Sequence, residues 1–402
     1  MKKGNLYLFT VSYPFGAGET FLNDEIEHHL ENFERVVVMP LRQADKERGM
    51  ASGIELDCSC MVPNNIFGYL FMLGSFFKFE FWQELLIRPK LLFKPSELGR
   101  VLVYILRKKL VTKWLNENKE QINGGVLYSY WLGGVSEAIG DFKQKFKNCL
   151  AVSRAHGYDL YKYRSYIPRH YYTLKNIDYV LNISGDGKSY LDSEYPEMAH
   201  KFRVARLGVS NIDKLNSKVE TSFLISCSSL APVKRIDKLI YALSLSKNKI
   251  KWVHLGGGPL MTDLMKLSEN LLSGGNVEYE FMGDVCHSDV LSFLSNTTAS
   301  CFLNTSESEG IPVSIMEAYS AGIPAVATDV GGVSELVNSS NGVLVNKDFE
   351  PIELIESIEY VFNNHKKLSF AAKETWSDKF NGEVNYAALS LFLYKSSLNV
   401  YE

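Results

Sequence analysis

The stretch SESEGIPVSIMEAYSAGIP, residues 306–324, places Glu309 and Glu317 eight positions apart around a Gly and a Pro. An apolar run typical of a strand ends just before this stretch, and polar residues then form a loop. Pro312 suits the first turn of a helix, so the pattern predicts a short helix over residues 312–321. A helix start at the carboxyl end of a strand leaves free N–H groups that attract an anion.

The spacing of the two glutamates limits what they can do together. Because Pro312 separates them, they cannot act as one close carboxylate pair. Either they contact different parts of one extended ligand, or Glu309 is a solvated loop residue and Glu317 a helix-surface residue. An anion at the helix start, with one carboxylate toward a sugar and the other toward a ribose, fits a nucleoside-diphosphate sugar.

The composition of the whole chain is that of a globular protein without a nucleic-acid partner. Its 402 residues suggest two domains, and 46% apolar residues with a net charge of −3 argue against a general nucleic-acid binder. No run of 18 apolar residues predicts a membrane span, and the apolar run 6–11 is too short for a signal peptide. Six scattered cysteines favour reduced thiols over a zinc site. We therefore expect a cytoplasmic protein.

Short apolar runs alternate with amphipathic segments along most of the chain, which predicts parallel sheets covered on both faces. One set of strands is expected at 5–11, 35–39, 125–129, 149–153 and 178–183, and a second at 222–227, 250–255, 277–282, 299–303, 325–327 and 342–345. The polar stretch 207–221 between the two sets is typical of a linker. The predicted fold class is α/β, with two doubly wound Rossmann-like domains that face a cleft. These domains are expected over residues 1–207 and 222–375, with a C-terminal helix in 376–402 crossing back to the first domain.

The stretch 306–324 resembles the E-x7-E motif of the family 4 retaining glycosyltransferases, which have the GT-B fold. The sequence VATDVGGVSELV, residues 326–337, is similar to the continuation of that motif. The resemblance implies that Glu309 lies beside the donor sugar and that Glu317 binds the nucleotide ribose. It also implies that a backbone segment holds the sugar and the diphosphate, and this segment consists of Gly310, Ile311, Pro312 and Val313.

Two adjacent cations, Lys234 and Arg235, start a predicted helix after the strand 222–227, where their charge opposes the helix dipole. A bound anion would compensate that cost, and the alternative is a solvated basic pair. The resembling family has a cation here that neutralises the leaving diphosphate, which makes Lys234 the first choice. The Arg of the family's G-R-L turn is absent, because Ser229 occupies its position. This departure leaves open whether Arg235 or another basic residue supplies the second charge.

Other candidate residues follow other predicted strands. His156 comes after the strand 149–153, and the resemblance implies a histidine there that contacts the donor sugar, although a lone histidine is more often structural. Gly16 and Gly18 follow the first strand and permit close approach to a phosphate, but this signal is weak by itself. The resemblance places Gly257 and the backbone of Val285 in the donor-binding loops of the second domain.

The insertion 66–115 breaks the alternating pattern. It carries nine Lys or Arg against three Asp or Glu, and basic residues are interleaved with the aromatic residues Phe67, Tyr69, Phe71, Phe76, Phe77, Phe79, Phe81 and Trp82. This composition suits a helix pair at an anionic lipid surface. The alternative is a pair of core-packed helices with solvated basic faces.

Together these features predict a retaining glycosyltransferase that moves a hexose from a nucleoside-diphosphate sugar to a saccharide or lipid-linked saccharide acceptor. The predicted role is in cell-surface polysaccharide biosynthesis, at the inner face of the membrane. The expected catalytic residues are Glu309, Lys234, His156 and Arg235. No metal or cofactor is expected, because no carboxylate pair suits a hard divalent ion. The alternatives are a catalytically silent sugar-nucleotide-binding scaffold, which the missing Arg favours, and a sugar-nucleotide epimerase of the same fold.

Overall fold

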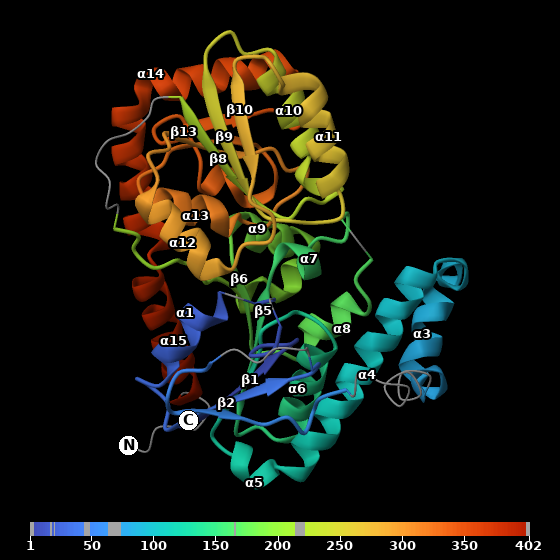
Figure 1. The fold of residues 1–402 in the computed structure, drawn as a ribbon. Helices are drawn as coiled ribbons and strands as arrows, with labels where there is room; N and C mark the ends of the chain where they lie inside the picture. The colour runs from blue at the N-terminus through green and yellow to red at the C-terminus, as the bar shows by residue number, and fades with distance from the viewer. Residues whose placement is uncertain are drawn as a thin grey trace. The chain divides into compact units, whose positions relative to one another are not determined.

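The computed structural model describes residues 4–16, 18–19, 21–43, 49–62, 74–164, 166–213 and 222–398 of the chain. It divides into two compact units. Unit 1 comprises Met1–Ala205 and Tyr386–Glu402, and unit 2 comprises Arg206–Asn385. Each unit is built around one sheet of parallel strands with helices packed against it (Figure 1). Most of the expected linker, residues 214–221, lies outside the described residues.

The sheet of unit 1 has seven strands in the order β3-β2-β1-β4-β5-β6-β7, and every neighbouring pair is parallel. The order 3-2-1-4-5-6 is that of a Rossmann-like fold. The strands are β1 Asn5–Thr10, β2 Arg35–Pro40, β3 Ile54–Leu56, β4 Val126–Ser129, β5 Leu150–Ala155, β6 Tyr179–Asn182 and β7 Phe202–Val204.

The helices of unit 1 cover both faces of this sheet. They are α1 Leu22–His29, α3 Phe79–Ile87, α4 Pro95–Glu117, α5 Lys119–Ile122, α6 Gly134–Lys145, α7 Gly157–Leu160, α8 His170–Lys175 and α9 Gly185–Glu194. The C-terminal helix α15, Gly382–Leu398, is counted with unit 1 from Tyr386 onward.

Alternate side chains of β1 show why the strands are continuous apolar runs. Leu6 and Leu8 belong to the hydrophobic cluster that contains residues of α1 and α15. Tyr7 and Phe9 point the other way, into the cluster that contains Val111 of α4 and residues of α6. Because both faces are buried, neither side of the strand can be polar.

Helix α4 packs along α6, and α3 packs on α4 (Figure 1). The approach of α4 to α6 requires a glycine, because a Cβ at Gly134 would lie 2.2 Å from the Tyr104 carbonyl oxygen. An apolar cluster that includes Phe81 and Leu102 joins the two helices of the α3–α4 pair. Part of the predicted insertion therefore has a small core of its own.

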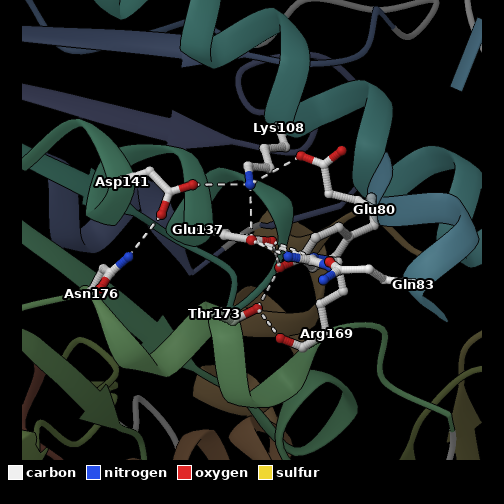
Figure 2. Close-up of polar contacts among 9 residues, drawn as sticks. Glu80, Gln83, Lys108, Glu137, Asp141, Arg169, Thr173 and Asn176 are labelled. Carbon is white, nitrogen blue, oxygen red and sulfur yellow. Dashed lines mark hydrogen bonds and ion pairs between the residues drawn. The ribbon is translucent and has the colours of Figure 1, made fainter. Parts of the chain in front are cut away.

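An ionic network around the buried Glu137 fixes this helix pair to the rest of unit 1 (Figure 2). The Lys108 ammonium lies 2.9 Å from carboxylate oxygens of both Glu137 and Asp141, and 3.4 Å from Glu80. Glu137 also accepts a hydrogen bond from Arg169 at 2.7 Å. Burial raises the pKa of Glu137, but the hydrogen bonds from Arg169 and the charge of Lys108 outweigh burial, so the pKa lies below its usual value.

Unit 2 repeats the same strand order around its own core. Its six parallel strands follow the order β10-β9-β8-β11-β12-β13, and these are β8 Phe223–Cys227, β9 Ile250–Leu255, β10 Val277–Phe281, β11 Cys301–Asn304, β12 Ala325–Thr328 and β13 Gly342–Val345. The helices are α10 Ile236–Ser244, α11 Met261–Leu272, α12 His287–Asn296, α13 Val313–Ser320 and α14 Pro351–Thr375. Leu224, Trp252 and Leu303 lie in one core cluster with residues of α10, α11 and α14.

All eleven predicted strands are present, with ends within two residues of the predicted ends. The sequence interpretation missed β3 and β7, which are three residues long. The fold class is confirmed in its central feature, two Rossmann-like α/β units with parallel sheets.

Candidate functional site

Residues 301–320, which include both glutamates, form a strand, a loop and a helix in unit 2. β11 ends at Asn304, the loop carries Glu309, and α13 begins at Val313 with Pro312 as its N-cap. Pro312 has an extended conformation (φ −77°, ψ 110°), so the helix starts one residue later than predicted. The Gly310 carbonyl accepts a hydrogen bond from the Gly332 N–H at 2.8 Å, which ties the Glu309 loop to the Gly-Gly pair after β12.

The Glu309 carboxylate is the centre of a polar cluster. Its Oε1 lies 2.6 Å from the Lys234 Nζ and accepts hydrogen bonds from Ser306 Oγ at 2.7 Å and Asn304 Nδ2 at 3.3 Å. The Glu309 and Lys234 side chains keep 12% and 23% of their surface exposed. The structure therefore brings together two residues that are 75 positions apart, and both remain accessible to a ligand.

The start of α13 offers backbone donors beside this cluster. Within the described ranges, the N–H groups of Ile311, Val313 and Ser314 meet no hydrogen-bond acceptor. These groups carry the positive end of the helix dipole and are suited to an anion. The Ile311 and Pro312 side chains are buried, so the segment presents mainly its backbone.

Arg235 lies next to Lys234 but has different partners. Its guanidinium donates to the carbonyl of Thr305 at 2.9 Å and to that of Lys347 at 2.7 Å. Its φ of 49° is in the left-handed region, which turns the chain between the 3₁₀ turn Pro232–Lys234 and α10. These contacts place Arg235 as a structural link between the loops after β11 and β13, and a contact with a diphosphate stays a prediction.

Glu317 lies within α13, and its side chain has a separate partner in α12. Its Oε1 lies 2.7 Å from Nε2 of His287, the first residue of α12. The Glu317 side chain is 6% exposed, and that of His287 is 34% exposed. The two glutamates thus have separate partners, which agrees with their expected inability to form one close pair.

Three loops at the carboxyl ends of β8, β9 and β10 converge in unit 2. A Cβ at Gly257 would lie 2.5 Å from the Asp284 carboxylate, and one at Gly256 would lie 2.0 Å from the Ser228 carbonyl oxygen. Gly256 has a φ of 129°, which favours glycine. Val285 follows Asp284 in the third loop and is partly exposed. The glycines therefore allow close backbone approach where the resemblance places donor-binding loops.

His156 belongs to unit 1 and is buried among aromatic rings. Its ring lies 4.4 Å from the Trp131 ring and 5.9 Å from that of Phe21, and both imidazole nitrogens lack a hydrogen-bond partner among the described residues. Burial, with a smaller contribution from the Arg154 charge, lowers its pKa to about 3, so the imidazole is neutral. Its backbone N–H donates to Asp159 Oδ1 at 2.6 Å. A contact between His156 and a donor sugar stays a prediction.

The loop after β1 is held by one buried carboxylate, that of Glu19. Glu19 accepts hydrogen bonds from the backbone N–H groups of Val11, Ser12 and Tyr13 at 2.7–2.9 Å and from the Trp131 indole at 2.6 Å. Gly16 has a φ of 70°, and a Cβ at Gly18 would meet only Ser12 Oγ at 3.6 Å. The positive φ of Gly16 therefore favours glycine in this turn, whereas the space around Gly18 would admit a Cβ.

The insertion presents an apolar surface. Seven large side chains from this segment are more than half exposed, and we call them the apolar patch: Phe77, Phe79, Trp82, Leu86, Ile87, Leu92 and Phe93. Of the aromatic residues predicted to face a membrane, Phe81 is buried, Phe76 packs on its cluster, and the three at positions 67, 69 and 71 lie outside the described residues.

The cations of the insertion are less available than the composition suggested. Lys108 is enclosed by carboxylates, and Lys94 lies 2.8 Å from Glu97, which also lies 3.8 Å from Arg88. The positive surface is therefore weaker than the count of basic residues indicated, whereas the apolar surface is stronger.

Two absences hold for the described part of the chain. Among those residues, no group of three or more His, Cys, Asp or Glu side chains is arranged to hold a metal ion. No helix within the described ranges has the length and apolar character needed to cross a bilayer.

Sequence reasoning missed several members of the site. The sequence analysis gave no role in the site to Asn304, Ser306 or His287. The signal for Asn304 and Ser306 was available, because both precede Glu309 at the carboxyl end of a buried strand. His287 could not be paired with Glu317 before the arrangement of α12 and α13 was known.

Comparison with known proteins finds similarity to glycosyltransferases, which is concentrated in unit 2. The family model "Glycosyl transferases group 1" matches residues 210–375. An uncharacterized glycosyltransferase of Methanocaldococcus jannaschii is 29% identical over 248 residues, which are 59% of this chain and 67% of that protein. The N-acetyl-alpha-D-glucosaminyl L-malate synthase of Bacillus anthracis is 23% identical over 218 residues, which are 52% of this chain and 51% of that protein.

Solved structures share the fold over nearly the whole chain. The Anabaena protein HepE, crystallised with UDP, has a TM-score of 0.68 and 16% identity, and the match covers 98% of this chain and all of that one. The lipopolysaccharide outer core galactosyltransferase WaaB has a TM-score of 0.69 and 15% identity, with 99% and 100% covered. These neighbours confirm the predicted GT-B fold class, and residues 210–375 match the model of the group 1 glycosyl transferases.

Proposed function

We propose that this protein is a retaining, metal-independent hexosyltransferase that uses a nucleoside-diphosphate sugar as donor. The observation that carries the proposal is the Lys234–Glu309 contact at 2.6 Å, beside the backbone donors at the start of α13. A cation and a helix N-terminus suit a diphosphate, and a carboxylate beside them suits the sugar attached to it. The family model and the glycosyltransferase relatives support transferase activity in general.

The mechanism follows from where charge develops. As the diphosphate departs, the anomeric carbon gains oxocarbenium character and the leaving oxygens gain negative charge. Lys234 and the α13 N-terminus would stabilise that leaving charge. The acceptor hydroxyl then attacks from the same face, and its proton passes to the departing phosphate. Glu309 would orient the sugar and stabilise the positive charge, and Glu317 would bind the ribose.

The donor is proposed to carry uridine in the first instance. Solved structures of the same fold were obtained with UDP, with UDP and glucose, and with UDP-glucose. A thermal-shift screen of UDP-, GDP- and ADP-hexoses tests this directly. We expect one nucleotide class to raise the melting temperature. If none of the three changes the melting temperature, donor binding is contradicted.

The acceptor is proposed to be a lipid-linked saccharide in cell-surface polysaccharide assembly, reached from the cytoplasmic face of the membrane. The apolar patch supports this proposal, because a monomeric soluble protein rarely exposes so many large apolar side chains together. Insertion of one such side chain contributes roughly 1.5–3 kcal/mol. Lys78 and Lys90 are exposed and lie between members of the patch in the sequence, and their charge favours anionic lipid. The protein would then bind the surface without a spanning helix.

A silent sugar-nucleotide-binding scaffold is the rival proposal, and one feature favours it. Ser229, at the position of the family's Arg, is exposed and cannot supply the missing charge. The accessible Lys234–Glu309 pair argues for the enzyme. Release of nucleoside diphosphate by the purified protein would exclude the scaffold.

A further inference from the structure

Unit 1 contains a cavity of about 760 Å³ that the sequence pattern did not predict. One wall is a stripe of α4, in which Ser96, Gly99, Arg100, Val103 and Arg107 follow the spacing of one helix face. Further lining residues come from the loops that follow β1 and β4. Since ligands of parallel α/β sheets bind outside the carboxyl ends of the strands, this cavity is placed where a ligand is expected.

The cavity is mainly apolar. Phe21, Trp131 and Ile167 line it together with Val103 of α4. Gly99 on the α4 wall leaves open space in the cavity, because a Cβ at this position would meet no atom within 4 Å. The walls therefore suit the hydrocarbon part of a ligand better than a bare sugar.

Arg107 gives the cavity a cation with no direct ionic partner among the described residues. Among those residues, its guanidinium makes no hydrogen bond or ion pair, whereas the adjacent Lys108 contacts three carboxylates. The carboxylate of Glu19 lines the same cavity, but it is occupied by the backbone of the β1 loop and by Trp131. Burial lowers the pKa of Arg107, and the charge of Glu19 offsets the desolvation cost of the guanidinium only in part. A bound anion would relieve that cost.

A second arginine of the stripe lies nearby with weaker partners. Arg100 donates to the Tyr166 carbonyl at 3.3 Å, and its guanidinium carbon lies 5.3 Å from the centre of the Tyr158 ring. Tyr158 is 66% exposed, which places this end of the cavity near solvent. The cavity thus combines apolar walls with two cations on one helix.

The wall that carries Arg107 is held rigidly. Tyr104 lines the cavity, and its hydroxyl donates to Glu137 at 2.7 Å within the ionic network of Figure 2. Lys108 fixes the next position of the helix to the same carboxylate. Because the network anchors α4 on α6 and α8, the cavity is formed before a ligand arrives.

The geometry points to this cavity as the site of the acceptor's non-sugar part, a hydrocarbon chain joined to a phosphate or diphosphate, with Arg107 on the anion and the α4 wall against the chain. This inference rests on the proposed function, and it narrows the acceptor to an anionic amphiphile. Uncharged lipids and free saccharides each match only half of the site.

The test is a calorimetric titration of the full chain with three probes. Farnesyl diphosphate carries both features, farnesol lacks the anion, and inorganic diphosphate lacks the chain. We expect farnesyl diphosphate to bind more tightly than either of the others. Titrations are repeated with Lys234→Ala protein, because a diphosphate could also occupy the start of α13. Equal binding of inorganic diphosphate in that background would overturn the inference.

Two variants locate the site. Gly99→Leu should fill the cavity and abolish binding of farnesyl diphosphate, while the melting temperature holds, because leucine favours a helix more than glycine does. Arg107→Gln should raise the Kd by about tenfold to a hundredfold, and Arg107→Lys by less. Lys109→Gln, an exposed cation two positions along α4, is the matched control and should change nothing.

The outcomes separate this inference from the proposed function. If the Kd for farnesyl diphosphate is the same in the wild type, Gly99→Leu and Arg107→Gln, the cavity is not the site. Thermal shifts with nucleotide sugars should persist in all these variants, since the substitutions lie in unit 1. Loss of nucleotide-sugar binding in the wild type itself would count against the proposed function instead.

Discussion

Replacing Lys234 by alanine should separate the chemistry of the site from its stability. The side chain lies 2.6 Å from Glu309 and is 23% exposed. A partly exposed ion pair contributes about 1 kcal/mol or less to stability. Glu309 keeps its hydrogen bonds from Ser306 and Asn304, so no buried charge is left without a partner. We therefore expect the protein to fold with a nearly unchanged free energy of unfolding.

Turnover should respond far more strongly. One lost group that stabilises a developing charge typically costs ~3 kcal/mol of transition-state energy, which corresponds to a rate roughly a hundredfold lower. Glu309→Gln should lower turnover to a similar extent, because the amide keeps the shape of the side chain and removes its charge. The double variant should lose less than the product of the two effects if both residues act on one transition state.

The assay combines steady-state release of nucleoside diphosphate with urea unfolding of the same preparations. Lys188→Ala is a matched control, since Lys188 forms a pair with Asp192 at 2.5 Å and is similarly exposed. That variant should keep full turnover. Near-normal turnover in both Lys234→Ala and Glu309→Gln would refute the site assignment.

Four further measurements probe other parts of the molecule. Glu317→Ala should raise the apparent Kd of the donor more than it lowers kcat, because a ribose contact is made in the ground and transition states alike, and the reverse result would exclude the ribose role. Activity should survive EDTA, and complete loss that Mg²⁺ or Mn²⁺ restores would show a metal requirement. Sedimentation with anionic vesicles should fall when Phe77 and Phe93 of the apolar patch are replaced by serine, and no sedimentation of the wild type at low salt would remove the membrane proposal. The melting temperature should fall as the pH drops below about 6.5. Burial lowers the pKa of three histidines, so the unfolded chain binds protons at a higher pH than the folded protein does; these are His156 (about 3), His170 (about 3) and His254 (about 4). A flat profile of melting temperature between pH 7 and 5 would contradict this.

The sheets were predictable because local sequence carries their signal. A strand buried on both faces, such as β2 with its run RVVVM, is apolar at nearly every position and stands out between polar segments. The edge strand β3 carries no such signal, because its three residues Ile-Glu-Leu are only partly buried or exposed. The start of α13 was predictable for a similar reason, since Gly310 and Pro312 act on the local backbone.

The side-chain partners in the site were not predictable, because they depend on which elements meet. Lys234 and Arg235 are neighbours in the sequence, yet one reaches Glu309 and the other binds backbone carbonyls. The difference comes from the left-handed turn at Arg235, which a non-glycine residue gives no reason to expect. Likewise, the composition of the insertion counted Lys108 as a surface cation, whereas the fold encloses it in the ionic network.

Whether the protein transfers a hexose is decided by the release of nucleoside diphosphate from UDP-, GDP- and ADP-hexoses by the purified full chain. We expect measurable release from one nucleotide class by the wild type, in the presence of EDTA, and roughly a hundredfold less from Lys234→Ala and Glu309→Gln. Binding of a nucleotide sugar without any release, in the wild type and with lipid-linked acceptors present, would exclude the transferase and leave the silent scaffold as the function.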